Sequence, residues 1–369
     1  MVDDFNEQVR LRRRTMFKIT LTYLIAVVLS SILTFPLQAK SPKIGFIYIG
    51  PPGDHGWTYM HDQGRQDIEI DLGFDTTYIE NVPENADAVR AIRKLAASGH
   101  DLIFTTSFNY MDQTLEVAKE FPNVKFEHAT GYMRAENVST YSSRFYEGRT
   151  IAGHIAGRES KTGTIGYIAS FPIPEVVRGI NAFMLAAQKV NPDIKVKIIW
   201  AFTWYDPGKE ADAAQTLINQ GADIIVQHTD TYAPCQVAQK NGVKAFGQAS
   251  NQYDFCPDAH LTAIIDEWGP YYVARAKAVA DGTWESTDTW KGLDSGMVEM
   301  APYRNMHPST KYEAIALQKA LTEGKVHSFE GPIYNQAGEL MIPEGEVAPD
   351  SMLAGMNWYV QGIDGDLPQ

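Results

Sequence analysis

Short apolar segments alternate with amphipathic segments along most of the chain. Eight apolar segments are rich in β-branched and aromatic residues, and they cover 44–49, 74–80, 101–106, 124–128, 164–169, 195–200, 223–227 and 244–247. Between them, apolar residues recur at helical spacing over 86–98, 176–190 and 210–220. Strands that alternate with helices are typical of parallel sheets built from βαβ units, so we expect an α/β fold.

The alternation falls into two halves. Four strand-helix units precede about residue 140, and four more lie between 164 and 247. Two open sheets are therefore favoured over a single eight-stranded barrel. The segment FYEGRTIAGHIAG, residues 145–157, joins the halves with a helical pattern rich in small residues, which suits a hinge between packed lobes. From Thr310 onward, the sequence predicts one helix followed by strands and turns.

The amino end has the pattern of an export signal. Five basic residues precede an uncharged apolar run over 19–35, and they are Arg10, Arg12, Arg13, Arg14 and Lys18. With the small residue Ala39 after the run, this order predicts a secretory signal peptide over 1–39. A single membrane anchor is the alternative, because the run is at the lower limit of spanning length. No cysteine stands directly after the run, so we expect no lipid anchor.

Charge and cysteine content narrow the class of protein. The chain has 45 Asp and Glu against 32 Lys and Arg, and a net charge of −13. This acidic balance argues against a nucleic-acid-binding protein, which needs a basic face. Cys235 and Cys256 are the only cysteines, too few for a disulfide scaffold or a four-cysteine zinc site. In an exported protein they could form one disulfide or remain two buried thiols.

The loops that follow the expected strands are unusually aromatic. Open parallel sheets bind ligands beyond the carboxyl ends of their strands, so these loops are the expected place for a site. Five of them place an aromatic residue beside a carboxylate, amide or hydroxyl, and they cover 50–65, 106–112, 200–210, 227–232 and 247–255. Trp57, Phe108 and Trp204 are therefore candidates for stacking on a planar ligand, with loop packing as the alternative for each.

Polar residues in the same loops could bind the edge of such a ligand. The candidates are Asp54, Asp230 and Asn251. The sequence lacks GxxxxGK[ST], GxSxG and HExxH motifs, and no GxGxxG follows the first expected strand. His55 and His61 with their neighbouring aspartates could hold a metal, but polar residues at a helix start need none. We expect a small-molecule binder with no catalytic residue, cofactor or metal; a nucleoside hydrolase is the less favoured alternative.

Five segments resemble, in order, motifs of the basic membrane protein family, the purine-binding proteins of ATP-driven (ABC) importers. They are GDHGWTYMHDQG, FYEGRTIAG, WYDPGKEADAAQTLINQGADII, GQASNQ and FEGPIYNQAGELMIP. The resemblance implies the two-lobed type I periplasmic binding protein fold, with parallel sheets flanked by helices and a hinge of crossing strands. On this fold we expect one lobe from 43–145 with 263–289, and the other from 146–262 with 290–369.

The same resemblance implies roles for several residues. Trp57 and Trp204 stand where the family places two aromatic residues that sandwich a purine, and Asp54 matches the acidic residue of the first loop. Asn251 stands where a ribose-binding Asp is usual, and 263–268 lacks the Lys common in nucleoside binders. We therefore prefer a purine base such as adenine, while a purine nucleoside stays open. A sugar-binding protein of the same fold is the alternative.

The resemblance finally implies a location and a partner. We expect a periplasmic monomer, released from its signal peptide, that delivers its ligand to the membrane permease of an ABC importer. A DNA-binding regulator of the same fold is disfavoured, because the predicted signal occupies the end where a helix-turn-helix would lie.

Overall fold

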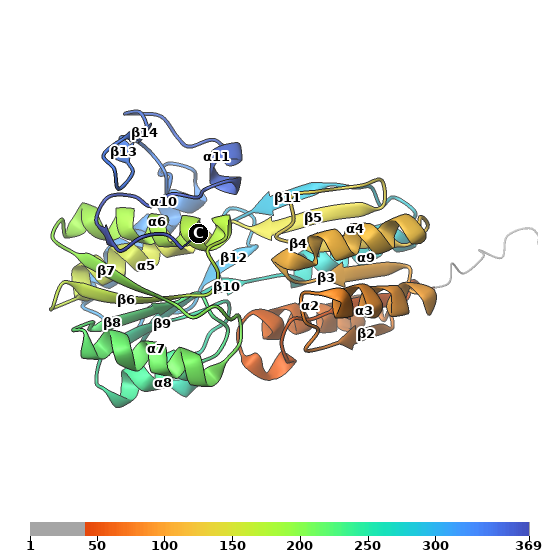
Figure 1. Cartoon of the computed structure of the whole chain (residues 1–369), viewed down its shortest axis with the longest axis horizontal. Helices are drawn as coiled ribbons and strands as arrows, with labels where there is room; N and C mark the ends of the chain where they lie inside the picture. The colour runs from red at the N-terminus through yellow and green to blue at the C-terminus, as the bar shows by residue number, and fades with distance from the viewer. Residues whose placement is uncertain (1–40, 369) are drawn as a thin grey trace, which may run out of the picture. The chain divides into compact units, whose positions relative to one another are not determined.

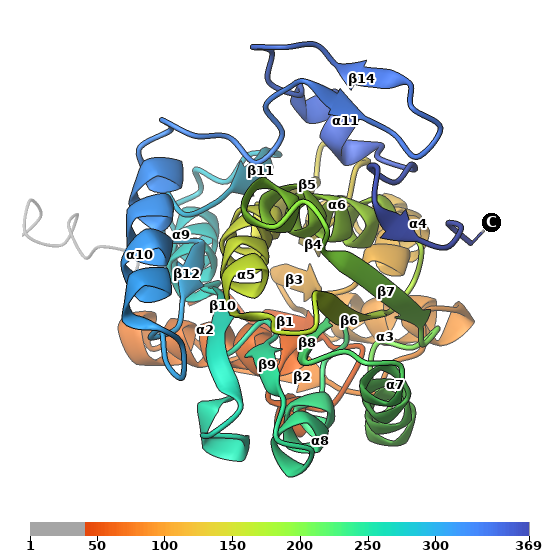
Figure 2. The ribbon, with the colours of Figure 1, turned by 90° about the vertical axis from the view of Figure 1, so that its left-hand side faces the viewer.

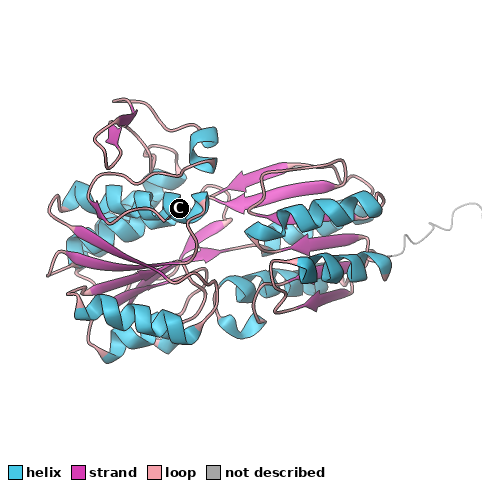
Figure 3. Ribbon diagram, in the orientation of Figure 1, coloured by secondary structure: helices cyan, strands magenta, loops and turns pink. Residues whose placement is uncertain are grey.

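The computed structural model describes residues 41–368. The predicted signal peptide over 1–39 lies outside these residues. Within the described part of the chain, none of the helices has the length and apolar character needed to cross a membrane. Two largely parallel sheets with helices on both faces account for most of the structure (Figure 3), which confirms the expected α/β class.

The first sheet has six parallel strands in the order β11-β5-β4-β3-β1-β2. They are β1 (Ile44–Ile47), β2 (Thr76–Ile79), β3 (Leu102–Thr105), β4 (Lys125–Ala129), β5 (Val138–Ser143) and β11 (Asp288–Lys291). Successive residues of β1 point to opposite faces, so Phe46 and Ile47 belong to different apolar clusters. One cluster lies under α2 (Trp57–Leu72) and α9 (Gly269–Ala280), and the other under α3 (Ala86–Ala97) and α4 (Met111–Glu120). We call this sheet and its helices lobe 1.

The second sheet has the order β12-β10-β9-β8-β6-β7-β15, and only the β10–β12 pair is antiparallel. Its strands are β6 (Thr164–Ala169), β7 (Lys195–Trp200), β8 (Ile224–Gln227), β9 (Lys244–Gly247), β10 (His260–Asp266), β12 (Val298–Met300) and β15 (Ile363–Asp364). Figure 2, which faces this lobe, shows its helices on both sides of the sheet; they are α5 (Phe145–Glu159), α6 (Pro174–Val190), α7 (Pro207–Asn219) and α8 (Ala233–Lys240). We call this sheet and its helices lobe 2.

The chain passes between the lobes three times. It passes from β5 into α5, from β10 into α9, and from β11 to β12 (Figure 1). The expected lobe boundary between 262 and 263 falls inside β10, which pairs with β9 and β12 of the second sheet. After the third crossing, α10 (Pro308–Thr322) packs on α5, and β13 (Ile333–Tyr334), β14 (Leu340–Ile342) and α11 (Asp350–Ala354) follow before β15.

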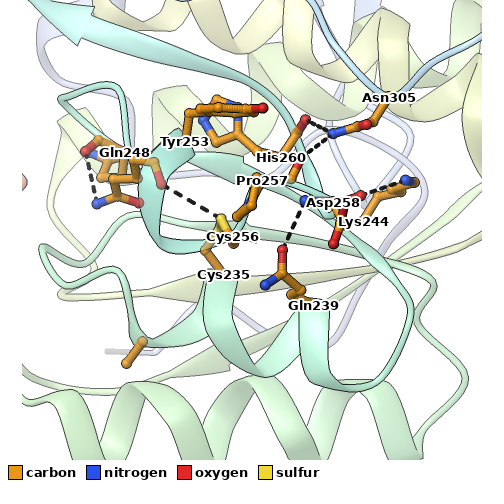
Figure 4. Close-up of a disulfide and its surroundings, with 12 residues drawn as sticks. Cys235, Gln239, Lys244, Gln248, Tyr253, Cys256, Pro257, Asp258, His260 and Asn305 are labelled. Carbon is orange, nitrogen blue, oxygen red and sulfur yellow. Dashed lines mark hydrogen bonds between the residues drawn. A yellow bond between two sulfur atoms is a disulfide. The ribbon is translucent and has the colours of Figure 1, made fainter.

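Cys235 and Cys256 form a disulfide in lobe 2, which answers the question that the sequence left open (Figure 4). Their Cα atoms are 5.8 Å apart, and the bridge ties the loop after β9 to the start of α8. The backbone nitrogen of Asp258 also donates to the Gln239 side chain of α8, at 2.8 Å. The loop over 248–256 is therefore anchored to α8 at its carboxyl end.

Removing the disulfide should lower the free energy of unfolding by about 2–3 kcal/mol. The bridge closes a loop of 21 residues, and its main effect is to restrict the unfolded chain. Urea denaturation of the Cys235→Ala/Cys256→Ala protein measures this loss, and wild-type protein unfolded in reductant is the matched comparison. A denaturation midpoint that reductant leaves unchanged would contradict the expectation.

Candidate ligand-binding cleft between the lobes

A cleft lies between the lobes where the carboxyl ends of strands from both sheets face each other. Its enclosed space is small, about 30 Å³, and reaches about 350 Å³ when all the open space out to its mouth is counted. Lobe 1 lines it with Ile49, Trp57, Ser107, Phe108 and Thr130, and lobe 2 with Glu175, Trp204, His228, Asp230 and Gln248. All ten residues follow the carboxyl end of a strand, which is where open parallel sheets bind their ligands.

The cleft brings together four of the six residues predicted to bind ligand. Trp57, Phe108, Trp204 and Asp230 line it. Asp54 is buried beside it and caps the start of α2: its carboxylate accepts from the backbone nitrogens of Gly56 at 2.8 Å and of Thr58 and Tyr59 at 2.9 Å. Asn251 is exposed, and its side chain accepts from the backbone nitrogen of Tyr253 at 3.3 Å. Asp54 thus holds the turn that carries Trp57.

The two tryptophans come from opposite lobes and differ in how firmly they are held. The Trp57 Nε1 donates to the carbonyl oxygen of Thr106 at 2.7 Å, and its ring stands edge-on to His61, with 4.4 Å between centroids. The Trp204 ring packs against Phe171, with centroids 5.2 Å apart. Its buried Nε1 has no hydrogen-bond partner within residues 41–368. The Trp204 N–H is therefore free to donate to a ligand.

Other polar atoms in the cleft are also buried without a partner. Within the described residues, these are the Asp230 Oδ2 and the His228 Nδ1. Buried polar groups are nearly always hydrogen-bonded in folded proteins, because leaving one unpaired costs about 1–3 kcal/mol. An acceptor on Asp230, a ring nitrogen on His228 and the indole donor of Trp204 together match a flat ligand with several polar edge atoms.

Burial sets the protonation of these groups. It raises the pKa of Asp230 well above its ordinary value, and the nearby Asp54 carboxylate raises it further. Burial also raises the pKa of Asp54 to about 6, despite the three backbone donors that favour its charged form. The pKa of His228 is lowered by burial and by the positive charges of Arg149 and Arg178. The cleft therefore presents a neutral imidazole and a carboxyl group that has no cationic partner in the part of the chain that the structure describes.

Asp230→Asn should stabilise the ligand-free protein at pH 8 by on the order of 1 kcal/mol or more, because it removes an uncompensated buried charge. The folded-state pKa of Asp230 is raised, so the folded wild type binds more protons than the unfolded chain above about pH 4. Its stability relative to the variant should fall as pH rises from 4 to 8. Urea denaturation of both proteins across this range checks the sign, and a difference that does not change with pH would refute it.

The lobes also touch beside the cleft. The carbonyl oxygen of His55 in lobe 1 accepts from the Ser250 Oγ and, at 3.3 Å, from the Gln252 Nε2. The His55 ring lies against Phe255, with centroids 4.8 Å apart. Gly56 packs directly on the backbone of Asp230. The structure is therefore a closed arrangement, in which the turn over 55–57 meets two loops of lobe 2.

Sequence reasoning missed several cleft residues. Ser107, His228 and Gln248 lie in loops that were singled out for their aromatic residues, but these side chains were not chosen. Glu175 and Thr130 follow β6 and β4, and the loops after these strands were not among the five that were singled out. Their position after a strand end, beside the aromatic residues Phe171 and Tyr132, was the available signal. Within residues 41–368, no three His, Cys, Asp or Glu side chains are grouped as metal ligands would be.

The chain is similar in sequence to one protein family and to two named relatives. Residues 41–336 match the family described as ABC transporter substrate-binding protein PnrA-like. A purine-binding protein of Brucella abortus is 57% identical over 329 residues, which cover 89% of this chain and 94% of that protein. TsgA13 of Haloferax volcanii, provisionally named an ABC transporter glucose-binding protein, is 32% identical over 90% of this chain and 83% of its own length.

A solved structure supports the fold. The ABC transporter solute-binding protein of Aeropyrum pernix K1 superposes with a TM-score of 0.70 at 17% identity, over 78% of this chain and 92% of that chain. At this identity the likeness concerns the fold alone. It agrees with the two-lobed arrangement of parallel sheets described above.

Proposed function

The chain belongs to the PnrA-like family of ABC transporter substrate-binding proteins, the family indicated by its motifs, and on that premise we propose that it binds a free purine base of the adenine type. The base would lie in the cleft between Trp57 and Trp204. The observation that carries the proposal is this pair of tryptophans from opposite lobes, together with three buried polar atoms that lack partners within residues 41–368.

Each part of the cleft has a role in this proposal. The aromatic faces of Trp57 and Trp204 stack on the ring, and each face contributes on the order of 1–3 kcal/mol. Asp230 accepts a hydrogen bond from an N–H of the base, and Trp204 donates one to a ring nitrogen. Asp54 acts indirectly, because it fixes the turn before Trp57.

Binding would work through closure. A ligand that touches both lobes makes its full set of contacts only when they are closed, so it shifts the equilibrium toward the closed arrangement. The closed protein would then deliver the base to the permease of an ABC importer. We place this carrier in the periplasm as a monomer, exported by the predicted signal over 1–39.

Two other classes of ligand, purine nucleosides and sugars, should be compared with the free base in the same experiment. A purine nucleoside would need space for its ribose. A sugar could also stack its pyranose ring on the aromatic faces, and it would need hydrogen-bond partners for its hydroxyl groups. The provisional name of the Haloferax relative makes glucose the sugar to include.

Thermal unfolding with adenine, guanine, adenosine, inosine and glucose separates these candidates. A ligand at 100 times its Kd should stabilise the protein by about 2.7 kcal/mol, and calorimetry then gives the Kd. We expect adenine to bind most tightly. Stabilisation by glucose alone would overturn the proposal in favour of a sugar carrier. Release of free base from adenosine, followed by chromatography, would indicate a hydrolase instead.

A further inference from the structure

One side chain of the cleft is oriented by a buried arginine. Gln248 directly follows β9, lines the cleft and is only 2% exposed. Its Oε1 accepts a hydrogen bond from the Arg149 Nη2. Figure 4 shows Gln248 at the start of the loop that contains Cys256. The carbonyl oxygen of Gln248 accepts from the backbone nitrogen of Ser250 at 2.7 Å, so both its backbone and its side chain are held.

The contact with Arg149 decides which end of the Gln248 amide is left for a ligand. A guanidinium can only donate hydrogen bonds, so the amide atom beside it must be the oxygen. The nitrogen lies on the other side of the same carbon, and it is the polar atom left to face the cleft. Within residues 41–368, the Gln248 Nε2 makes no hydrogen bond of its own. It therefore keeps its protons for a ligand.

Arg149 is itself firmly held. It belongs to α5, is fully buried, and its Nη2 also donates to the carbonyl oxygen of Gln227 at 2.7 Å. Its guanidinium lies 5.0 Å from the centroid of the Phe145 ring and 5.3 Å from that of the Tyr167 ring. Turning the Gln248 amide over would place its NH₂ group against this fixed cation, with two donors facing each other. The amide therefore has one favourable orientation.

The oriented amide adds a second donor to the cleft. The Trp204 N–H is the first, and the Asp230 Oδ2 is an acceptor; neither has a partner in the described part of the chain. Adenine has ring nitrogens that accept hydrogen bonds and N–H groups that donate them. Two donors and one acceptor on the protein therefore match two ring nitrogens and one N–H of the base.

We propose that Gln248 is a specificity-determining residue, whose Nε2 donates to a ring nitrogen of the purine, and that Arg149 is the positioning residue that keeps this donor turned toward the ligand. The proposal rests on the proposed function, because it assumes a purine base between Trp57 and Trp204. It adds that the cleft requires an acceptor atom at one defined position of the ring and disfavours a base with an N–H there.

Adenine analogues that each lack one ring nitrogen test the donor by calorimetry. In 1-, 3- and 7-deazaadenine, a C–H group replaces the nitrogen, which removes one acceptor and keeps the flat ring. At least one analogue should bind the wild type about fivefold or more weakly than adenine, because it leaves a buried donor without a partner. Equal affinity for adenine and all three analogues would overturn the proposal.

Gln248→Glu identifies the analogue that reports on this side chain. A carboxylate also accepts from a guanidinium, so the variant keeps the contact with Arg149 and loses only the donor. It should bind adenine about tenfold or more weakly than wild type does. The analogue whose missing nitrogen had faced Gln248 should then bind the variant about as well as adenine does, while the other analogues keep their wild-type ratios to adenine.

Two further variants control for charge. Gln248→Met adds no charge and also lacks the donor, so it should lose the same discrimination. Gln236→Glu makes the same charge change at an exposed residue of α8 and should alter none of the affinities. Discrimination that persists in Gln248→Met would overturn the role of Gln248.

Arg149 variants test the positioning role through a ratio of affinities. In Arg149→Met the Gln248 amide loses the group that fixes it, so the preference for adenine over the reporting analogue should fall by about threefold or more. Arg149→Lys keeps a donor for the Gln248 Oε1 and should retain more of the preference. This ratio does not depend on how much of a variant is folded. A purely structural role of Arg149 would therefore leave it unchanged, and that result would overturn the positioning role.

The outcomes separate this proposal from the proposed function. If adenine binds but every analogue has the same ratio to adenine in wild type and in Gln248→Glu, the inference about Gln248 fails alone. If neither adenine nor any analogue binds the wild type, the proposed function fails and this inference fails with it.

Discussion

Gly56→Ala should abolish high-affinity binding, with a loss of at least a hundredfold. A Cβ at position 56 would overlap the carbonyl oxygen of Asp230 and lie 2.9 Å from its carbonyl carbon. Because the obstructing atoms are backbone, no side-chain movement relieves the overlap, and the lobes could not reach the closed arrangement. The ligand would then keep the contacts of one lobe only.

Gly53→Ala is the matched control for this variant. Gly53 lies in the same loop, and a Cβ there would meet nothing within 4 Å. Calorimetry with adenine should give wild-type affinity for Gly53→Ala and no measurable binding for Gly56→Ala. Small-angle scattering should show that adenine compacts wild type and Gly53→Ala but not Gly56→Ala. Closure of Gly56→Ala with normal affinity would show that the contact between Gly56 and Asp230 is dispensable.

Trp57→Ala and Trp204→Ala should each weaken adenine binding by about tenfold to a hundredfold, since each ring face contributes on the order of 1–3 kcal/mol. The double variant should lose on the order of a thousandfold. The two rings line the cleft from opposite lobes, so each variant leaves the other face in place.

Phenylalanine variants separate stacking from hydrogen bonding. Trp57→Phe keeps an aromatic face, and the lost N–H had bound Thr106 of the protein, so its affinity should stay close to that of wild type. Trp204→Phe also loses a donor that is free for ligand, so it should bind more weakly than Trp57→Phe. Unchanged affinity in both alanine variants would refute the sandwich, whatever the phenylalanine variants show.

Much of the fold could be predicted because most strands are apolar runs bounded by helices. All eight expected strands are present, and α3, α6 and α7 lie where helical spacing predicted them. The strand β5 was missed because its sequence, VSTYSS, is polar and shows no apolar run. Its buried hydroxyls are satisfied by distant groups: Ser143 donates to Asp266 at 2.7 Å, and the Ser139 Oγ accepts from the backbone of Thr287. Such long-range partners leave no local signal.

The sequence predicted most of the loops that form the candidate site, but it predicted fewer of the individual residues that line it. An aromatic residue in a Gly-Pro loop pointed to Trp57, but an acidic residue before a helix can either cap it or bind ligand. Asp54 caps α2, and only its three backbone donors distinguish the two roles. Glu175 was missed because the loop after β6, which carries Phe171, was not singled out, although Glu175 at the start of α6 lines the cleft.

The unequal anchoring of the two tryptophans has a consequence for the time course of binding. Trp57 is oriented by its own lobe before any ligand arrives, whereas the Trp204 N–H gains its partner only from the ligand. A base would therefore bind first to the Trp57 face in lobe 1. Its association rate would not be limited by a rearrangement of that lobe. The dissociation rate would depend on lobe 2, because the hydrogen bond from the Trp204 indole to the ligand must break before the ligand can leave the protein.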